Sequence, residues 1–105
     1  MTLSRTAAVL VAAGLGAVAV ASGALAQSLT EVWRTAGFAS PESVSYDSGT
    51  NALYVTNINS PDFSANGEGY VSRLGLDGKV IEEKFAQGLN APKGTFVANG
   101  VLYVA

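Results

Sequence analysis

The stretch GFASPE at residues 37–42 points to the fold of this chain, because a close copy, GLNAPK, returns at residues 88–93. Each copy is followed by a short segment of β-forming residues, a turn, and the triplet Leu-Tyr-Val, at 53–55 and again at 102–104. The prolines of the two copies are 51 residues apart and the triplets 49. A change of length confined to a turn is expected between copies of one structural unit.

Alternation of apolar and polar residues predicts the strands of this unit. Four segments of the first copy are expected to form a meander, namely 43–46, 52–56, 70–76 and 80–85. Further strands are expected at 95–97 and 102–104 in the second copy, and at 29–35 before the first copy. Asp77-Gly78 and Asn99-Gly100 predict type I′ turns, which need positive φ at both central residues.

A repeat of this length, made of four short strands, is typical of a β-propeller blade. The sequence therefore predicts an all-β chain that contains the first blade of a β-propeller and part of the second. A small β-sandwich with two similar segments is the alternative. The last expected strand, 102–104, would be an apolar edge, which complete proteins usually cover. We therefore expect residues 27–105 to be the N-terminal part of a longer, truncated domain.

Residues 1–26 predict a secretory signal peptide. Arg5 supplies a positive charge, residues 7–21 form an uncharged run of 15 residues, and Ala24-Leu25-Ala26 matches the pattern that signal peptidase recognises. The run is shorter than the roughly 20 residues that cross a bilayer as a helix. We expect cleavage after Ala26, no stable membrane anchor afterwards, and a periplasmic or secreted location. An uncleaved anchor is the alternative.

The composition of residues 27–105 excludes several functions. Five basic and eight acidic residues give this segment a net charge of −3 without a basic cluster, which argues against nucleic acid as a partner. The chain has no cysteine and no histidine. Disulfides, a Ser-His-Asp triad and histidine metal sites are therefore excluded within these residues. Any catalysis would depend on carboxylates, amides and a metal.

The two corners, residues 37–42 and 88–93, place Glu42 and Lys93 at equivalent positions, each directly after a proline and before the innermost strand of its unit. Because proline fixes φ, the next side chain enters the strand on a rigid approach. Glu42 and Lys93 are expected to point from adjacent units toward one axial opening, where they would hold a metal or polarise a substrate oxygen. The alternative is a pair of solvated rim residues, or an ion pair worth under about 1 kcal/mol.

Four segments of the chain carry a resemblance to a known superfamily. Residues 40–47 (SPESVSYD), 51–57 (NALYVTN), 69–80 (GYVSRLGLDGKV) and 88–94 (GLNAPKG) resemble the opening of gluconolactonase/regucalcin, or senescence-marker-protein-like, propellers. The likeness covers most of residues 27–105, and NHL-repeat propellers share much of the pattern. It implies a six-bladed β-propeller, of which this chain is the first blade and part of the second.

In that superfamily, lactone hydrolases hold one divalent cation on the axis, with a first-blade glutamate as a ligand. Glu42 matches that glutamate, so the resemblance implies a cation such as calcium or zinc at Glu42, with further ligands, an Asn and an Asp, from later blades. The enzymes usually have Glu-Gly-Pro-x-Trp, whereas this chain has ESVSY at residues 42–46. Asn90 resembles a substrate-contacting asparagine of the family. Asn90 and Lys93 are therefore the candidate substrate-binding residues, and no catalytic residue is assigned.

The loop at residues 60–68 contains Asp62, Asn66 and Glu68, whose oxygen atoms are of the kind that calcium prefers. Their spacing differs from that of an EF-hand, and a solvated connection is the favoured interpretation. Asn57 and Asn59 stand where a strand ends near this loop. They are expected either to reach a ligand or to cap a turn.

Three functional hypotheses follow. The first is an exported gluconolactonase-like propeller that hydrolyses a small lactone with the help of a divalent cation. The second is a non-catalytic periplasmic NHL-like propeller that binds or scaffolds a protein partner, which the absence of Gly-Pro after Glu42 favours. The third is a truncated, inactive product that folds poorly alone.

Overall fold

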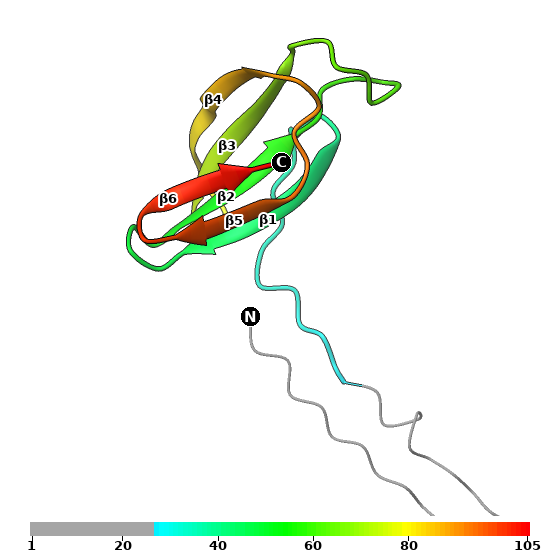
Figure 1. Ribbon diagram of the computed structural model, residues 1–105. Coiled ribbons are helices and arrows are strands. Elements are labelled where there is room, and N and C mark those ends of the chain that lie inside the picture. The colour runs from blue at the N-terminus through cyan, green and yellow to red at the C-terminus, as the bar shows by residue number, and fades with distance from the viewer. Residues whose placement is uncertain (1–26) are drawn as a thin grey trace, which may run out of the picture. The chain divides into compact units, whose positions relative to one another are not determined.

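The computed structural model describes residues 27–105, which form strands and loops without a helix (Figure 1). The expected signal peptide, residues 1–26, lies outside the described residues. Residues 33–105 make up one compact body. Over the described part of the chain, no helix has the length and apolar character needed to span a membrane. The prediction of an all-β chain is confirmed.

The first sheet is a four-stranded antiparallel meander with the strand order β1-β2-β3-β4. Its strands are β1 (Pro41–Asp47), β2 (Ala52–Asn57), β3 (Gly69–Gly75) and β4 (Val80–Leu89). The central strands β2 and β3 are mostly buried, whereas β4 is an exposed edge strand. All four strands were predicted, although β4 continues four residues beyond its expected end at residue 85.

The second sheet is a hairpin of β5 (Thr95–Ala98) and β6 (Val101–Val104). Asn99 and Gly100, which join the two strands, have φ angles of 51° and 75°. Positive φ at both central residues is the signature of a type I′ turn, so this prediction is confirmed. The hairpin lies beside the first sheet, with β5 next to β1 (Figure 1).

The turn between β3 and β4 differs from its prediction. Gly78 has a φ of 80°, but Asp77 does not have positive φ, so the turn is not type I′. The amide of Gly78 donates to the Gly75 carbonyl at 3.0 Å, and the amide of Gly75 donates to the Lys79 carbonyl at 2.9 Å. The Asp77 carboxylate accepts a hydrogen bond from the Lys79 amide at 3.0 Å. This side-chain bond favours an ordinary turn followed by one left-handed glycine.

The predicted strand at residues 29–35 is wrong, because within residues 27–105 no strand precedes β1. Side chains rather than a backbone ladder attach the end of this segment to the sheet. The indole Nε1 of Trp33 donates to the Leu76 carbonyl at 2.9 Å, and the Thr35 hydroxyl donates to the Gly78 carbonyl. A strand needs a neighbouring free edge, and this segment instead lies against the β3–β4 turn.

One part of the core lies between the two sheets, and Val55 and Leu74 are buried on the opposite face of the first sheet. Ala52, Tyr54 and Val71 are buried between the sheets, and three partly buried apolar residues pack against them, namely Ala86, Leu89 and Leu102. Leu102 belongs to the hairpin, so the two sheets share one core. The Tyr54 ring also contacts the Phe85 ring, with centroids 5.1 Å apart and a tilt of 57°, an arrangement that aromatic pairs favour.

Side chains along each strand alternate between two faces of the sheet. The hydroxyls of Ser43 and Ser45 in β1 both bond to the Thr95 hydroxyl in β5, which identifies the contact face of the first sheet and that of the hairpin. The open face of the first sheet, on the opposite side, carries Val44, Tyr46, Leu53 and Val55. The hairpin's contact face carries Thr95, Val97, Leu102 and Val104, and its open face carries Phe96, Ala98, Val101 and Tyr103.

The two units are stacked in the same sense. By the repeat, Val44 on the open face of the first sheet corresponds to Thr95 on the contact face of the hairpin. Conversely, Tyr54 on the contact face of the first sheet corresponds to Tyr103 on the open face of the hairpin. Each unit therefore has two different faces, a front that carries Val44 or its equivalent Thr95, and a back that carries Tyr54 or its equivalent Tyr103. The front of the second unit packs on the back of the first.

Candidate functional site

The two corners adopt the same backbone conformation. Gly37 and Gly88, which begin them, have φ angles of 96° and 77°. Ser40 and Ala91, which directly precede the prolines, have φ angles of 52° and 47°. Residues other than glycine rarely adopt this left-handed region, so its recurrence at Ser40 and Ala91 supports a structural repeat. Glu42 and Lys93 therefore occupy structurally equivalent places.

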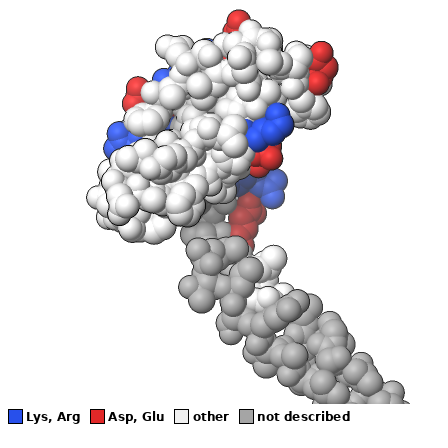
Figure 2. All heavy atoms as spheres, in the orientation of Figure 1, with Lys and Arg blue, Asp and Glu red and all other residues white. Residues whose placement is uncertain are grey.

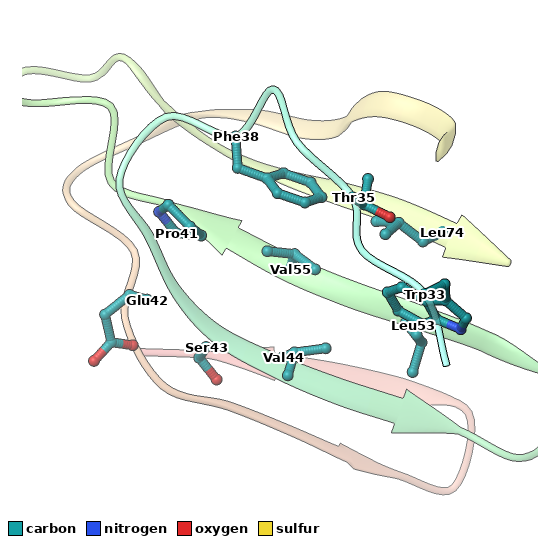
Figure 3. A pocket seen from close by; sticks show the side chains of 10 residues that line it. All are labelled: Trp33, Thr35, Phe38, Pro41, Glu42, Ser43, Val44, Leu53, Val55 and Leu74. Atoms are coloured by element: carbon teal, nitrogen blue, oxygen red, sulfur yellow. The ribbon is translucent and has the colours of Figure 1, made fainter. Parts of the chain in front are cut away.

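Glu42 is the extra residue of a β-bulge at the start of β1. Pro41 lies opposite Asn57 and Ser43 lies opposite Thr56, so the register shifts across Glu42. A bulge turns a side chain out of the regular alternation and is common beside functional sites. The Glu42 side chain is exposed, and Figure 3 shows its carboxylate directed away from the apolar side chains of the open face. Glu42 is thus accessible to a ligand at the corner end of β1.

Lys93 lies next to the first corner through its backbone. The buried Thr56 hydroxyl accepts a hydrogen bond from the Ser43 amide at 3.0 Å and donates to the Lys93 carbonyl at 2.8 Å. The Lys93 ammonium, however, donates to the Ala91 carbonyl at 3.2 Å, and its side chain forms no ion pair with Glu42. The structure brings the two corners together while leaving the acid and the base separate.

Asn90 is exposed. A Cβ atom at Gly67 would be 3.9 Å from the Asn90 Oδ1 atom, which places Asn90 beside the loop that follows β2. The structure therefore groups Lys93 with the first corner and Asn90 with the neighbouring loop.

Two buried residues position this site, namely Thr56, which the sequence did not single out, and Asn57, for which it left two alternatives. Thr56, with no exposed surface, joins the two corners. Asn57, also fully buried, accepts a hydrogen bond from the Ala39 amide at 3.0 Å and donates to the Ser72 hydroxyl at 3.1 Å and to the Val55 carbonyl at 3.2 Å. Asn57 therefore caps the first corner, which was one of the two alternatives for it.

A cavity of about 300 Å³ lies on the open face of the first sheet, beneath residues 33–38 (Figure 3). Apolar side chains line most of it, chiefly those of Trp33, Phe38, Val44, Leu53, Val55 and Leu74. Glu42 lies at one end of this row with its carboxylate turned away from it. The cavity offers no cluster of polar groups that would orient a polar substrate.

The loop at residues 60–68 uses its polar atoms for its own conformation. The Asp62 carboxylate accepts hydrogen bonds from the Ser60 hydroxyl at 2.8 Å and from the Ser64 amide at 3.2 Å. Asn66 Oδ1 accepts one from the Glu68 amide at 2.9 Å, and Asn59 Nδ2 donates to the Glu68 carbonyl at 2.9 Å. These bonds support the interpretation of a solvated connection with capped turns.

Local hydrogen bonds and burial shift the pKa of Asp62, in this loop, and of Tyr70, in β3. Hydrogen bonds from Ser64 and Ser60 stabilise the ionised Asp62 carboxylate and lower its pKa to about 2. Burial raises the pKa of the Tyr70 hydroxyl, the nearby Glu83 carboxylate raises it further, and a hydrogen bond with the Ala39 backbone opposes the shift. The Asp62 carboxyl lies outside the two corners, whereas the Tyr70 hydroxyl bonds to the backbone of the first corner at Ala39.

A divalent cation needs several oxygen ligands, and Glu42 supplies one. Across residues 27–105, the acidic side chains nowhere gather in a group of three or more. Glu42 as a metal ligand stays a prediction, and no chemical step through a metal follows from the geometry.

No protein-family model, curated protein or solved structure matches this chain. The function must therefore be argued from the chain's own residues. The features available for that argument are the repeated corners, the exposed Glu42 and the same-sense stacking of the two units.

Proposed function

We propose that this chain is part of an exported gluconolactonase-like β-propeller, with β1–β4 as its first blade and β5–β6 as the inner half of the second. The supporting observation is the same-sense stacking of two units with matching corners. Stacking in which the front of one unit meets the back of the next generates a ring when the rotation closes. A β-sandwich instead turns the apolar inner faces of its two sheets toward each other.

The ligand site of this propeller is the end of the β1–β5 seam where the two corners meet. The accessible Glu42 carboxylate and the Lys93 ammonium, whose present partner is a single carbonyl, offer an acceptor and a donor for a small oxygen-rich molecule. A hydroxylated lactone fits this pair of groups, because its carbonyl oxygen can accept a hydrogen bond from the Lys93 ammonium and a hydroxyl group can donate one to the Glu42 carboxylate. Hydrolysis would require a divalent cation, for which Glu42 is one ligand and later blades supply the others.

Non-catalytic binding or scaffolding of a protein partner is the second candidate function. It is favoured by the ESVSY sequence at residues 42–46, which lacks the family's Gly-Pro, and by the fold of Lys93 back onto its own corner. Under this function, Glu42 and Lys93 are ordinary exposed residues at the rim.

The experiment compares lactone hydrolysis by the full chain before and after chelation, with calcium or zinc restored afterwards. Binding of each cation is measured in parallel by titration calorimetry. Glu42→Gln keeps the size of the side chain and removes its charge, and Glu68→Gln, in an exposed loop, is the matched control. Metal-dependent hydrolysis that Glu42→Gln abolishes and Glu68→Gln leaves intact supports the lactonase. Hydrolysis that survives both chelation and Glu42→Gln would remove it. A full-length protein that neither hydrolyses lactones nor binds either cation favours the binding of a protein partner.

A further inference from the structure

A second cavity, of about 540 Å³, lies at the end of the β1–β5 seam opposite the two corners. It is lined by the β1–β2 turn (residues 48–51), by the β5–β6 turn (residues 99–100) and by neighbouring strand residues, and Figure 1 shows the two turns at the same end of the sheets. Most of β1, whose seven residues span about 20 Å, separates this cavity from Glu42. Its volume is in the range of small-molecule sites.

The alternation of β1 directs Asp47 toward this cavity. Ser43, Ser45 and Asp47 follow one another on the contact face of the first sheet. The hydroxyls of Ser43 and Ser45 bond to the Thr95 hydroxyl of the hairpin. Asp47 is the next residue of this row, and it lines the cavity between the first sheet and the β5–β6 turn.

The β1–β2 turn holds the Asp47 carboxylate in place and keeps it ionised. The carboxylate accepts hydrogen bonds from the Gly49 amide at 2.9 Å and from the Thr50 hydroxyl at 2.7 Å. These bonds lower the pKa of Asp47, the Thr50 bond most strongly. A carboxylate has about four acceptor positions, so the two bonds leave room for donors from a ligand.

The walls of the cavity provide no positive charge. Asp47 is the one charged side chain among the described residues that line it. Residues 35–72 and 94–105, which contain the two turns, include no Lys or Arg. Figure 2 shows an uncharged surface over β5 and β6, with acidic and basic residues placed around it. An ionised carboxylate in such a cavity attracts a positively charged ligand.

The other lining residues favour an organic cation over a metal ion. A single carboxylate balances a single positive charge, whereas a divalent cation needs several oxygen ligands. Tyr54 and Val97, on the contact faces of the two sheets, give the cavity apolar walls, and Thr50 and Asn99 add polar groups. Apolar walls with a few polar groups are typical of sites for small organic molecules.

The repeat does not explain this carboxylate. Asp47 corresponds to Ala98 in the second unit, and the β1–β2 turn is two residues longer than the β5–β6 turn. A residue that the shared strand pairing required would occur in both units. The longer turn and its carboxylate are therefore additions to the first unit, and they form one wall of the cavity.

We propose that this cavity binds a small organic ammonium ion, whose N–H groups donate to the Asp47 carboxylate while its carbon chain lies along the walls at Tyr54 and Val97. The cavity is retained in the ring proposed above, because further strands of the ring would pair with β6 or cover the two open faces, and the cavity lies between the contact faces. It contains neither Glu42 nor Lys93, so the proposal does not depend on lactone binding.

The test titrates the full chain with butylammonium and follows the backbone amide signals by NMR. We expect the amides of Gly49 and Thr50 in one turn and of Asn99 and Gly100 in the other to shift together. Neutral 1-butanol, which has the same number of non-hydrogen atoms, should bind at least tenfold more weakly, and Glu42→Gln should bind butylammonium as the unmodified chain does. The proposal is overturned if butylammonium leaves either turn unshifted, or if 1-butanol binds equally well.

Asp47→Asn and Asp62→Asn are a matched pair of variants. Each replaces a carboxylate that caps a turn with an amide that keeps an accepting oxygen, and each removes one negative charge. Asp47→Asn should weaken butylammonium binding at least tenfold, because a charge-assisted hydrogen bond is lost, and Asp62→Asn should leave it unchanged. Equal affinity of Asp47→Asn and the unmodified chain overturns the proposal, and so does an equal loss in both variants, which reveals attraction to net charge. Circular dichroism verifies folding, and if Asp47→Asn does not fold, the two titrations of the unmodified chain decide.

Discussion

Replacement of Asn57 by alanine is expected to destabilise the body formed by residues 33–105 severely. The Asn57 side chain makes three hydrogen bonds and has no exposed surface. Its loss leaves the Ala39 amide without an acceptor, at a cost of about 1–3 kcal/mol, and each other lost bond adds roughly 0.5–1.5 kcal/mol. We expect a total of about 2–6 kcal/mol, which is a large share of the roughly 4–11 kcal/mol that a body of this size possesses.

The measurement is urea unfolding followed by circular dichroism and by the fluorescence of Trp33, which is the chain's single tryptophan. A fixed, low protein concentration keeps self-association from contributing to the apparent stability. Asn90→Ala is the matched control, since Asn90 is exposed, and it should change stability by less than about 0.5 kcal/mol. The melting temperature of Asn57→Ala should fall by at least about 10 °C, because each kcal/mol shifts it by about 4–8 °C in a domain of this size.

Ser72 tests whether the polar network acts as a unit. Its hydroxyl accepts from Asn57 and donates to the Glu83 carbonyl at 2.6 Å, which connects β2, β3 and β4. The double variant Asn57→Ala with Ser72→Ala should therefore lose less than the sum of the single losses, with a coupling of at least about 0.5 kcal/mol. Strict additivity, or a loss below about 1 kcal/mol for Asn57→Ala, would refute the argument that this network holds the first corner.

Three further changes have equally definite outcomes. Gly88→Ala should lower the free energy of unfolding in urea by about 1–2 kcal/mol, because the φ of 77° is unfavourable for alanine although a Cβ atom there would meet no neighbour. Gly94→Ala is the control, since Gly94 has equal space and no positive φ, and it should be neutral or stabilising. The Asp62 carboxyl should titrate near pH 2 by NMR, and its pKa should move toward the ordinary value of 3.8 in Ser60→Ala. Its contribution to stability is present above pH 3.8 and is lost as the pH falls toward 2. An unshifted titration would contradict the hydrogen-bonded loop. Because folding raises the pKa of Tyr70, its hydroxyl favours the folded state below pH 10, and this contribution is lost as the pH rises further. Tyr70→Phe should therefore weaken the fall of the unfolding free energy with pH above pH 10. An unchanged fall would count against the burial of this hydroxyl.

Much of the local structure was predictable because its causes lie within a few residues. Alternation placed β1, β2, β3, β5 and β6 within about two residues of their observed ends. The Asn99-Gly100 turn follows from the ease with which these two residues adopt positive φ. The repeat likewise predicted that residues 88–93 would have the conformation of residues 37–42, since matched sequences encode matched corners.

Of the two failures, one has a distant cause and the other a local one. Residues 29–35 have the composition of a strand, but Trp33 bonds to a carbonyl 43 residues away and no backbone ladder forms. The Asp77-Gly78 pair is a strong hairpin signal, yet the bond from the Lys79 amide to the Asp77 carboxylate selects another turn. Only the Trp33 bond lies beyond the reach of a prediction based on neighbouring residues. The Asp77 bond is a local side-chain contact, which the general preference of Asp-Gly for a type I′ turn does not include.

Part of the candidate site could likewise be predicted from the sequence, and part of it could not. Glu42 and Lys93 could be chosen from the repeat, because equivalent positions after a proline are visible in the chain. The bulge that exposes Glu42, the Thr56 hydroxyl that joins the corners and the return of Lys93 to Ala91 were not visible. The bulge depends on the register between β1 and β2, and the Thr56 bond joins residues 37 apart in the chain. The Lys93 bond is local, but it is one of several conformations open to a long side chain. The tight turns need only the φ preferences and hydrogen bonds of adjacent residues.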